Sequence, residues 1–142
     1  MISKYFSIQE LVPREAFNYL GVDKCIWLLD PRLLTLLDVI REHFNVPVTI
    51  NNWSTDGQYN ESGFRLCSTK TGATMSQHKF GRAADMKFEG LTDYEAIRKE
   101  IQANWPKFKD AGLTTIEAAT PTWLHVDIRF TGSDDLLIVP YR

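Results

Sequence analysis

Apolar residues recur every three or four positions along residues 31–44, which is the spacing of one face of an α-helix. The positions on this face are Leu33, Leu36, Leu37, Ile40 and Phe44. Asp30 and Pro31 form a typical helix start, with an acidic cap followed by a proline in the first turn. We therefore predict a helix over residues 31–44 whose apolar stripe packs on a sheet.

Shorter helices are predicted on both sides of this segment. A capping box at residues 7–10 indicates a short helix near the N-terminus, and Pro13 and Gly21 can begin and end the next one. A second capping box at residues 92–95 predicts a helix that runs toward Trp105.

Five stretches rich in β-branched or apolar residues predict strands. They are residues 46–53, 82–88, 113–118, 123–130 and 136–139. Helices come first, and the strands follow with one helical interruption. This order predicts an α+β fold with a mostly antiparallel sheet and helices covering one face. Residues 54–74 are polar and contain several glycines, and a loop of this length in a compact domain is usually functional.

The length and composition are those of one soluble domain. The chain has 142 residues, of which 44% are hydrophobic and 24% charged. We expect a single domain over residues 1–142, with a helical N-terminal part at residues 1–45 and the core of the site at residues 46–142. The net charge of −2 gives no basis for binding nucleic acid or an anionic membrane, so we expect neither partner and a monomeric protein.

The sequence carries no signal for export or membrane insertion. It has no run of eighteen apolar residues, and residues 1–10 lack the apolar core of a secretory signal, so we expect synthesis in a cytoplasm. Cys25 and Cys67 are too few for a disulfide framework and are expected to be free thiols.

The predicted strand at residues 123–130 has two different faces. Its even positions are all apolar, and its odd positions are Trp123, His125, Asp127 and Arg129. Because strand side chains alternate between faces, the apolar face belongs in the core. Taken alone, the other face is explained as well by exposure to solvent as by a functional site.

A second cluster lies some forty residues earlier. His78 and Asp85 are seven positions apart, and the intervening Gly81, Ala83 and Ala84 allow close approach of other groups. A His and an Asp on one segment, with a His on another strand, form the ligand set of a catalytic zinc site, which leaves a fourth position for water. The alternative is a hydrogen-bonded His–Asp pair without a metal.

Residues 76–85, SQHKFGRAAD, match the pattern S-x-H-x-x-G-x-A-x-D of the zinc D-alanyl-D-alanine peptidases. This group includes bacterial D,D-carboxypeptidases and dipeptidases and phage L-alanyl-D-glutamate endolysins, and its metal site is shared with the Hedgehog signalling domain. Residues 123–127 match the family's W-x-H-x-D segment. The resemblance covers roughly residues 46–129, and the first 45 residues resemble the lead-in of small phage and prophage members. It implies the Hedgehog/DD-peptidase-like α+β fold.

The resemblance assigns roles to individual residues. It implies that His78, Asp85 and His125 bind Zn²⁺, with Ser76 beside the site. Arg65 would hold a substrate carboxylate or the developing oxyanion, since a guanidinium stays charged and offers a planar fork of donors. The alternative for Arg65 is a surface position on a loop. Trp123 is a candidate wall of the substrate cleft.

One position departs from the family pattern. Many members carry the catalytic glutamate three residues before the last histidine, and Thr122 stands there in this chain. A zinc peptidase needs a carboxylate to move a proton from water to the leaving amine. Glu117 is our preferred base, on a strand that could pair with the His125 strand, and Asp127 is the alternative. We expect Asp127 rather to orient a ligand or Arg129.

The function implied is zinc-dependent hydrolysis of an amide bond in peptidoglycan stem peptides, of the D,D-carboxypeptidase or the L-Ala-D-Glu endopeptidase type. Such a phage enzyme would reach the cell wall after release at lysis or as part of a virion. The alternative is a non-catalytic zinc-binding structural or binding module of a phage particle, which the missing glutamate at Thr122 favours.

Overall fold

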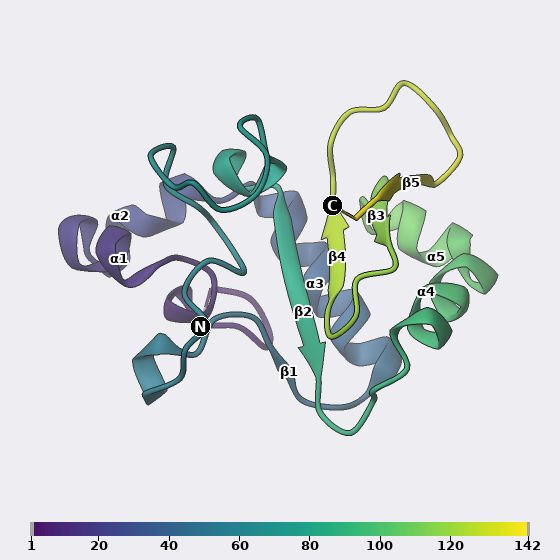
Figure 1. Ribbon diagram of the computed structural model, residues 1–142, viewed down its shortest axis with the longest axis horizontal. Coiled ribbons are helices and arrows are strands. Elements are labelled where there is room, and N and C mark those ends of the chain that lie inside the picture. Colours follow the sequence, from purple (N-terminus) through teal and green to yellow (C-terminus); the bar gives the residue numbers. More distant parts are fainter. Residues whose placement is uncertain (1, 142) are drawn as a thin grey trace.

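The computed structural model describes residues 2–141 and shows a five-stranded sheet with helices packed on it (Figure 1). The strands are β1 (Val48–Thr49), β2 (Ala83–Phe88), β3 (Thr115–Ala118), β4 (Leu124–Asp127) and β5 (Leu137–Pro140). Their order is β1-β2-β4-β3-β5, and the β3–β5 pair is parallel while the other three pairs are antiparallel. The predicted α+β fold with a mostly antiparallel sheet is confirmed.

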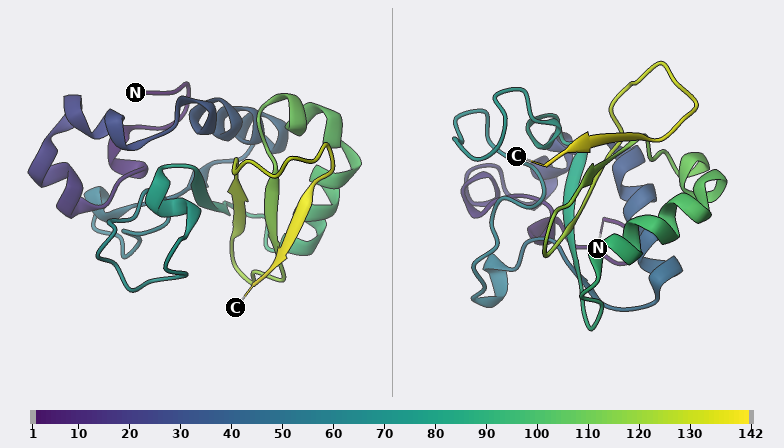
Figure 2. Two further views of the ribbon diagram at one scale, coloured as in Figure 1. Left: turned by 90° about the horizontal axis from the view of Figure 1, so that it is seen from above. Right: turned by 45° about the vertical axis from the view of Figure 1, so that its right-hand side comes forward.

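Three of the α-helices lie on one face of this sheet (Figure 1). The α-helices are α1 (Arg14–Leu20), α2 (Val22–Cys25), α3 (Pro31–Phe44), α4 (Tyr94–Ala103) and α5 (Trp105–Asp110). Short 3-10 helices are η1 (Ile8–Glu10), η2 (Ile26–Leu28), η3 (Trp53–Thr55) and η4 (Gln77–Phe80). Helices α3, α4 and α5 pack behind the sheet, and α1 and α2 lie at the opposite end of the molecule from α4 and α5 (Figure 2). None of the helices in residues 2–141 is long and apolar enough to cross a membrane.

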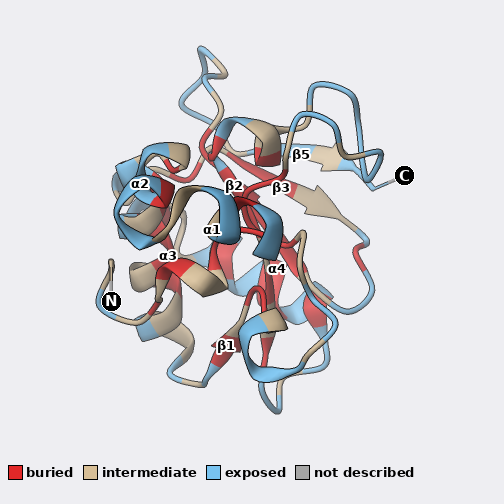
Figure 3. Cartoon of the chain, turned by 90° about the vertical axis from the view of Figure 1, so that its left-hand side faces the viewer, coloured by how far each residue is buried: buried red, intermediate tan, exposed pale blue. Residues whose placement is uncertain are grey.

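Helix α3 forms as its sequence predicts. The Asp30 side chain accepts a hydrogen bond from the backbone N–H of Arg32, Pro31 occupies the first turn, and Asn45 ends the helix in the left-handed conformation. Four of the five predicted apolar positions are buried, namely Leu33, Leu36, Leu37 and Ile40. They join apolar residues of β2, β3 and β4 in one core, seen as the buried centre of Figure 3.

The predicted strands at residues 46–53 and 123–130 are at least four residues shorter in the structure. The stretch at residues 46–53 contributes only the two residues of β1, because Asn51 turns its hydrogen bonds away from the sheet. The backbone N–H of Asn51 donates to the carbonyl of Glu10. The Asn51 side chain donates to the carbonyl of Val12 and accepts from the backbone N–H of Ser62. Strand β4 ends at Asp127, and Phe130, predicted on the core face, is 96% exposed.

Gly81 sits where η4 turns into β2, and its conformation predicts a sharp stability effect. Its φ is +69°, and a Cβ there would lie 1.9 Å from the carbonyl oxygen of Leu28. Gly90 has a similar φ of +77° but open space around it, so it is a matched control. We expect Gly90→Ala to cost about 1 kcal/mol of unfolding free energy from the left-handed backbone alone. Gly81→Ala should cost more than about 3 kcal/mol, since the backbone at Leu28 must also move.

Urea denaturation of both variants, with the slope m checked, measures this difference. Equal losses in the two variants would show that the close approach of Gly81 to η2 does not constrain the turn.

Candidate metal centre

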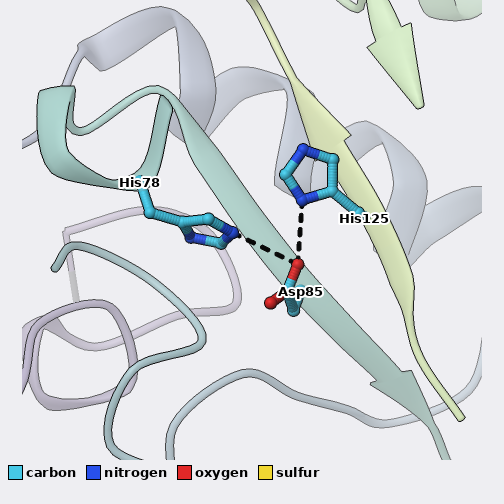
Figure 4. A group of neighbouring side chains, drawn as sticks. All are labelled: His78, Asp85 and His125. Atoms are coloured by element: carbon cyan, nitrogen blue, oxygen red, sulfur yellow. Dashed lines mark hydrogen bonds and ion pairs between the residues drawn. The ribbon is translucent and has the colours of Figure 1, made fainter. Parts of the chain in front are cut away.

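Strand pairing brings Asp85 and His125 together. The two residues are direct partners in the antiparallel β2–β4 ladder, so their side chains project from the same face of the sheet. The Nδ1 atom of His125 lies 2.9 Å from Oδ1 of Asp85 (Figure 4). Two residues forty positions apart in the sequence therefore meet because of the register of one strand pair.

The third residue of the centre, His78, comes from η4. The Ser76 hydroxyl accepts a hydrogen bond from the backbone N–H of His78 and caps this short helix, and Gly81 ends it. The His78 Nε2 atom lies 3.3 Å from the same Asp85 Oδ1, as Figure 4 shows. Ligand atoms of His78, Asp85 and His125 all lie within 4.8 Å of one another. The structure thus brings together the three predicted metal ligands.

The environment of both imidazoles suits a zinc ion. The Nδ1 of His78 lies 2.8 Å from the carbonyl oxygen of Gly63, and the Nε2 of His125 lies 2.9 Å from Oδ2 of Asp127. These oxygens can accept the outer N–H of each ring, which leaves the inner nitrogens, Nε2 of His78 and Nδ1 of His125, to bind a cation beside Asp85. Histidine ligands of zinc are held in this way in proteins. Two imidazoles and one carboxylate are a ligand set of catalytic zinc, which takes a solvent molecule as its fourth ligand.

The charges of the centre are strongly coupled. Burial alone would lower the pKa of His125, but hydrogen bonds to Asp127 and Asp85 outweigh it and raise this pKa to about 9. Burial would raise the pKa of Asp85, but the neighbouring His78 and His125 hold it well below its usual range. Burial lowers the pKa of His78. At neutral pH without a metal, His125 is therefore the protonated imidazole.

Two further candidate residues, Arg65 and Glu117, contact the ligand set. Arg65 donates from Nη2 to Oδ2 of Asp85 at 3.2 Å and from Nε to the carbonyl of Glu61 at 2.7 Å. Its side chain is 10% exposed, which contradicts the alternative of a surface loop position. Glu117, on β3, places Oε1 3.2 Å from Nδ1 of His125 and stays 23% exposed. Both side chains line the same cleft.

Asp127 occupies a different position. Its side chain is completely buried and lies against Nε2 of His125, the ring nitrogen that faces away from Asp85. Arg129 donates to it from Nε at 2.9 Å and from Nη2 at 2.6 Å. Asp127 does not line the cleft, whereas Glu117 does. The geometry therefore favours Glu117 over Asp127 as a group that can touch a substrate.

The metal centre opens into a cleft of about 1150 Å³. The long irregular segment before η4 lines part of it, including Ser76, and the C-terminal residues 139–141 line another part. Trp123 also lines the cleft and packs edge-to-face on Tyr141, with ring centroids 5.2 Å apart.

Lys87 and Tyr141 are among the cleft residues that sequence reasoning missed. Strand alternation could have found Lys87, which follows Asp85 by two positions on β2 and so shares its face. Burial lowers the pKa of the Lys87 ammonium to about 8, so it still carries its charge at neutral pH. No pattern in the sequence pointed to Tyr141, because its place depends on β5 pairing with β3.

Comparison with known proteins identifies the family. The sequence profile described as Peptidase M15 matches residues 4–127, which is most of the chain. The chain belongs to the peptidase M15 family. Peptidases of this family depend on zinc, in agreement with the candidate centre of His78, Asp85 and His125. No curated protein and no solved structure matches the chain.

In this M15 peptidase the raised pKa of His125 predicts pH-dependent metal binding. Below a pKa of about 9, a proton must leave His125 before Nδ1 can bind zinc. Zinc affinity should therefore rise with pH, about tenfold per unit between pH 6 and 8. Calorimetric titration in buffers of different ionisation enthalpy should show about one proton released per zinc. An affinity independent of pH would contradict the assignment of His125 as a ligand.

Proposed function

We propose that this M15 peptidase hydrolyses an amide bond in peptidoglycan stem peptides, with zinc held by His78, Asp85 and His125. One observation carries the proposal: both inner imidazole nitrogens face the Asp85 carboxylate while their outer nitrogens are held by oxygen acceptors. The membership of the chain in the peptidase M15 family supports the same activity.

Glu117 is the proposed general base. Bound zinc would polarise the scissile carbonyl and lower the pKa of a water molecule. The Glu117 carboxylate, 3.2 Å from Nδ1 of His125 and open to the cleft, would take a proton from the attacking water and pass it to the leaving amine. Asp127 would hold the His125 ring from behind, since its oxygens are bound by His125 and Arg129.

Arg65 and the cleft walls complete the proposed site. Arg65 would fix the Asp85 carboxylate through Nη2, and its charge beside that ligand would stabilise the developing oxyanion or a substrate carboxylate. We propose Trp123 as a wall of the substrate cleft and Ser76 as the residue that places His78 and borders the substrate. D,D-carboxypeptidase and L-Ala-D-Glu endopeptidase activity both fit this arrangement.

Residues 1–45 resemble the lead-in of small phage members, which supports a role in degrading a host cell wall. The enzyme would meet the wall after release at lysis or as part of a virion. The second candidate, a non-catalytic zinc-binding module of a phage particle, is favoured by Thr122, which lines the cleft at the position where many relatives carry the catalytic glutamate.

Replacing the base separates these two candidates. Glu117→Gln keeps the shape of the side chain but removes its basicity, so we expect unchanged zinc content and a loss of kcat of about 10²–10⁴-fold. Glu89→Gln, an exposed glutamate at the end of β2, is the control and should behave as the unaltered enzyme. Release of products from purified cell walls and from synthetic stem peptides measures the effect.

Full turnover by Glu117→Gln would remove Glu117 from the mechanism. A zinc-loaded native protein that releases no product from any stem peptide would favour the non-catalytic module.

The metal ligands are tested independently of turnover. His78→Ala and His125→Ala should each lose stoichiometric zinc, because two ligands cannot hold the ion in a catalytic geometry. His43→Ala is the matched control: His43 lies on α3 beside Glu100 and Lys107 and should be irrelevant to metal binding. Elemental analysis after dialysis reports the zinc content. One equivalent of zinc retained by either His78→Ala or His125→Ala would contradict the ligand assignment.

A further inference from the structure

Lys87 is a cation in the cleft that the proposed catalytic chemistry does not use. It lies on β2, two positions beyond Asp85 and on the same face of the sheet. Its Nζ donates to the Ser62 hydroxyl at 2.8 Å and to the backbone carbonyl of Asp85 at 3.3 Å, and it lies 4.2 Å from the centre of the Tyr59 ring. All three of these partners are neutral groups.

Lys87 differs in this respect from the other basic side chains of the cleft. Arg65 is paired with Asp85, and Arg129 is paired with Asp127. Within residues 2–141, no carboxylate forms an ion pair with Lys87. A half-buried ammonium that faces a substrate cleft, with no carboxylate in direct contact, is suited to an anion brought by the substrate.

The surroundings of the ammonium are fixed by the fold. The backbone N–H of Ser62 binds the Asn51 side chain at 2.9 Å, and its carbonyl accepts from the backbone N–H of Asp85 at 2.8 Å. Ser62 is therefore tied to the strand that carries both Asp85 and Lys87. A subsite held in place in this way binds a ligand group without a cost in ordering its own side chains.

The distance from the metal centre sets which substrate group Lys87 can reach. The Cα atoms of residues two positions apart on a strand lie about 7 Å apart, and the Lys87 Nζ atom reaches back to within 3.3 Å of the Asp85 backbone carbonyl. An anionic group near Lys87 would therefore sit about one residue away from a carbonyl bound beside Asp85.

We propose that Lys87, with Ser62 and Tyr59, forms a subsite for a carboxylate carried by the substrate residue next to the scissile amide. The proposal rests on the peptidase function proposed above. The shared chemistry has two sources in stem peptides: the terminal carboxylate of a chain-end residue, or the free α-carboxylate of a glutamate linked through its side chain. The first source corresponds to carboxypeptidase activity and the second to endopeptidase activity.

Binding to the Glu117→Gln zinc enzyme tests the subsite without requiring turnover. Two pairs of peptides are titrated at pH 7 by calorimetry. The members of the first pair differ in ending with a carboxylate or a carboxamide. The members of the second pair contain an internal glutamate linked through its side chain, with its α-carboxylate either free or converted to an amide. We expect the carboxylate to bind about 10–100-fold more tightly than the amide in one pair, as for a charge-assisted hydrogen bond. The pair that shows this preference identifies the source of the carboxylate.

Adding Lys87→Met, which keeps the length of the side chain and removes its charge, should abolish the preference while zinc content and thermal stability stay unchanged. Ser62→Ala keeps the Lys87 charge but removes the hydroxyl that positions the ammonium, so it should reduce the preference for the carboxylate only in part. Lys99→Met, an exposed position on α4, should leave it intact.

No preference for the carboxylate in either pair would overturn the subsite, and so would a preference that survives Lys87→Met. Because these readouts are binding constants, a protein that binds with this preference but releases no product would refute the proposed hydrolysis and leave the subsite standing. Product release by the native enzyme without any carboxylate preference in binding would refute the subsite and leave the proposed hydrolysis standing.

Discussion

The register between β2 and β4 is the constraint on which the site depends. It sets Asp85 opposite His125, and it sets Ala83, with its small side chain, opposite the buried Asp127. A shift by one residue would turn each of these side chains to the other face of the sheet, so the metal centre and the core would be lost together. Leu124 and Val126 form the apolar face of β4 and pack in the core. Their burial thereby fixes the direction of the polar face.

Charges of alternating sign run through the buried site. Arg129 pairs with Asp127, Asp127 with His125, His125 with Asp85, and Asp85 with Arg65. Buried charges are tolerated when each is paired and hydrogen-bonded, and the removal of one leaves its neighbours uncompensated. A zinc ion bound to a neutral His125 would bring its positive charge to the place where the imidazolium stands in the metal-free protein. Asp85 would then face zinc and Arg65, and Asp127 would still face Arg129.

The sequence was sufficient to predict the helix over residues 31–44 and the mostly antiparallel sheet, because periodicity and element order can be read along the chain. The sequence predicted the gathering of His78, Asp85 and His125 only through its resemblance to the zinc peptidases, since spacing alone left a metal-free His–Asp pair open. It left Glu117 and Asp127 open as bases, since alternation tells which face a side chain takes but not what covers that face. It also missed Lys87, although strand alternation places this residue on the face of Asp85, and it missed Tyr141, whose place depends on the pairing of β5 with β3.

One zinc ion held by three side chains is the centre of the proposed function, and X-ray absorption at the zinc edge of the zinc-loaded protein observes that ion directly. We expect two imidazole nitrogens at about 2.0–2.1 Å, one carboxylate oxygen at about 2.0–2.2 Å and one further light ligand from solvent. A shell without two imidazoles, or one with sulfur at about 2.3 Å from the exposed thiol of Cys67, would contradict the assignment of His78, Asp85 and His125.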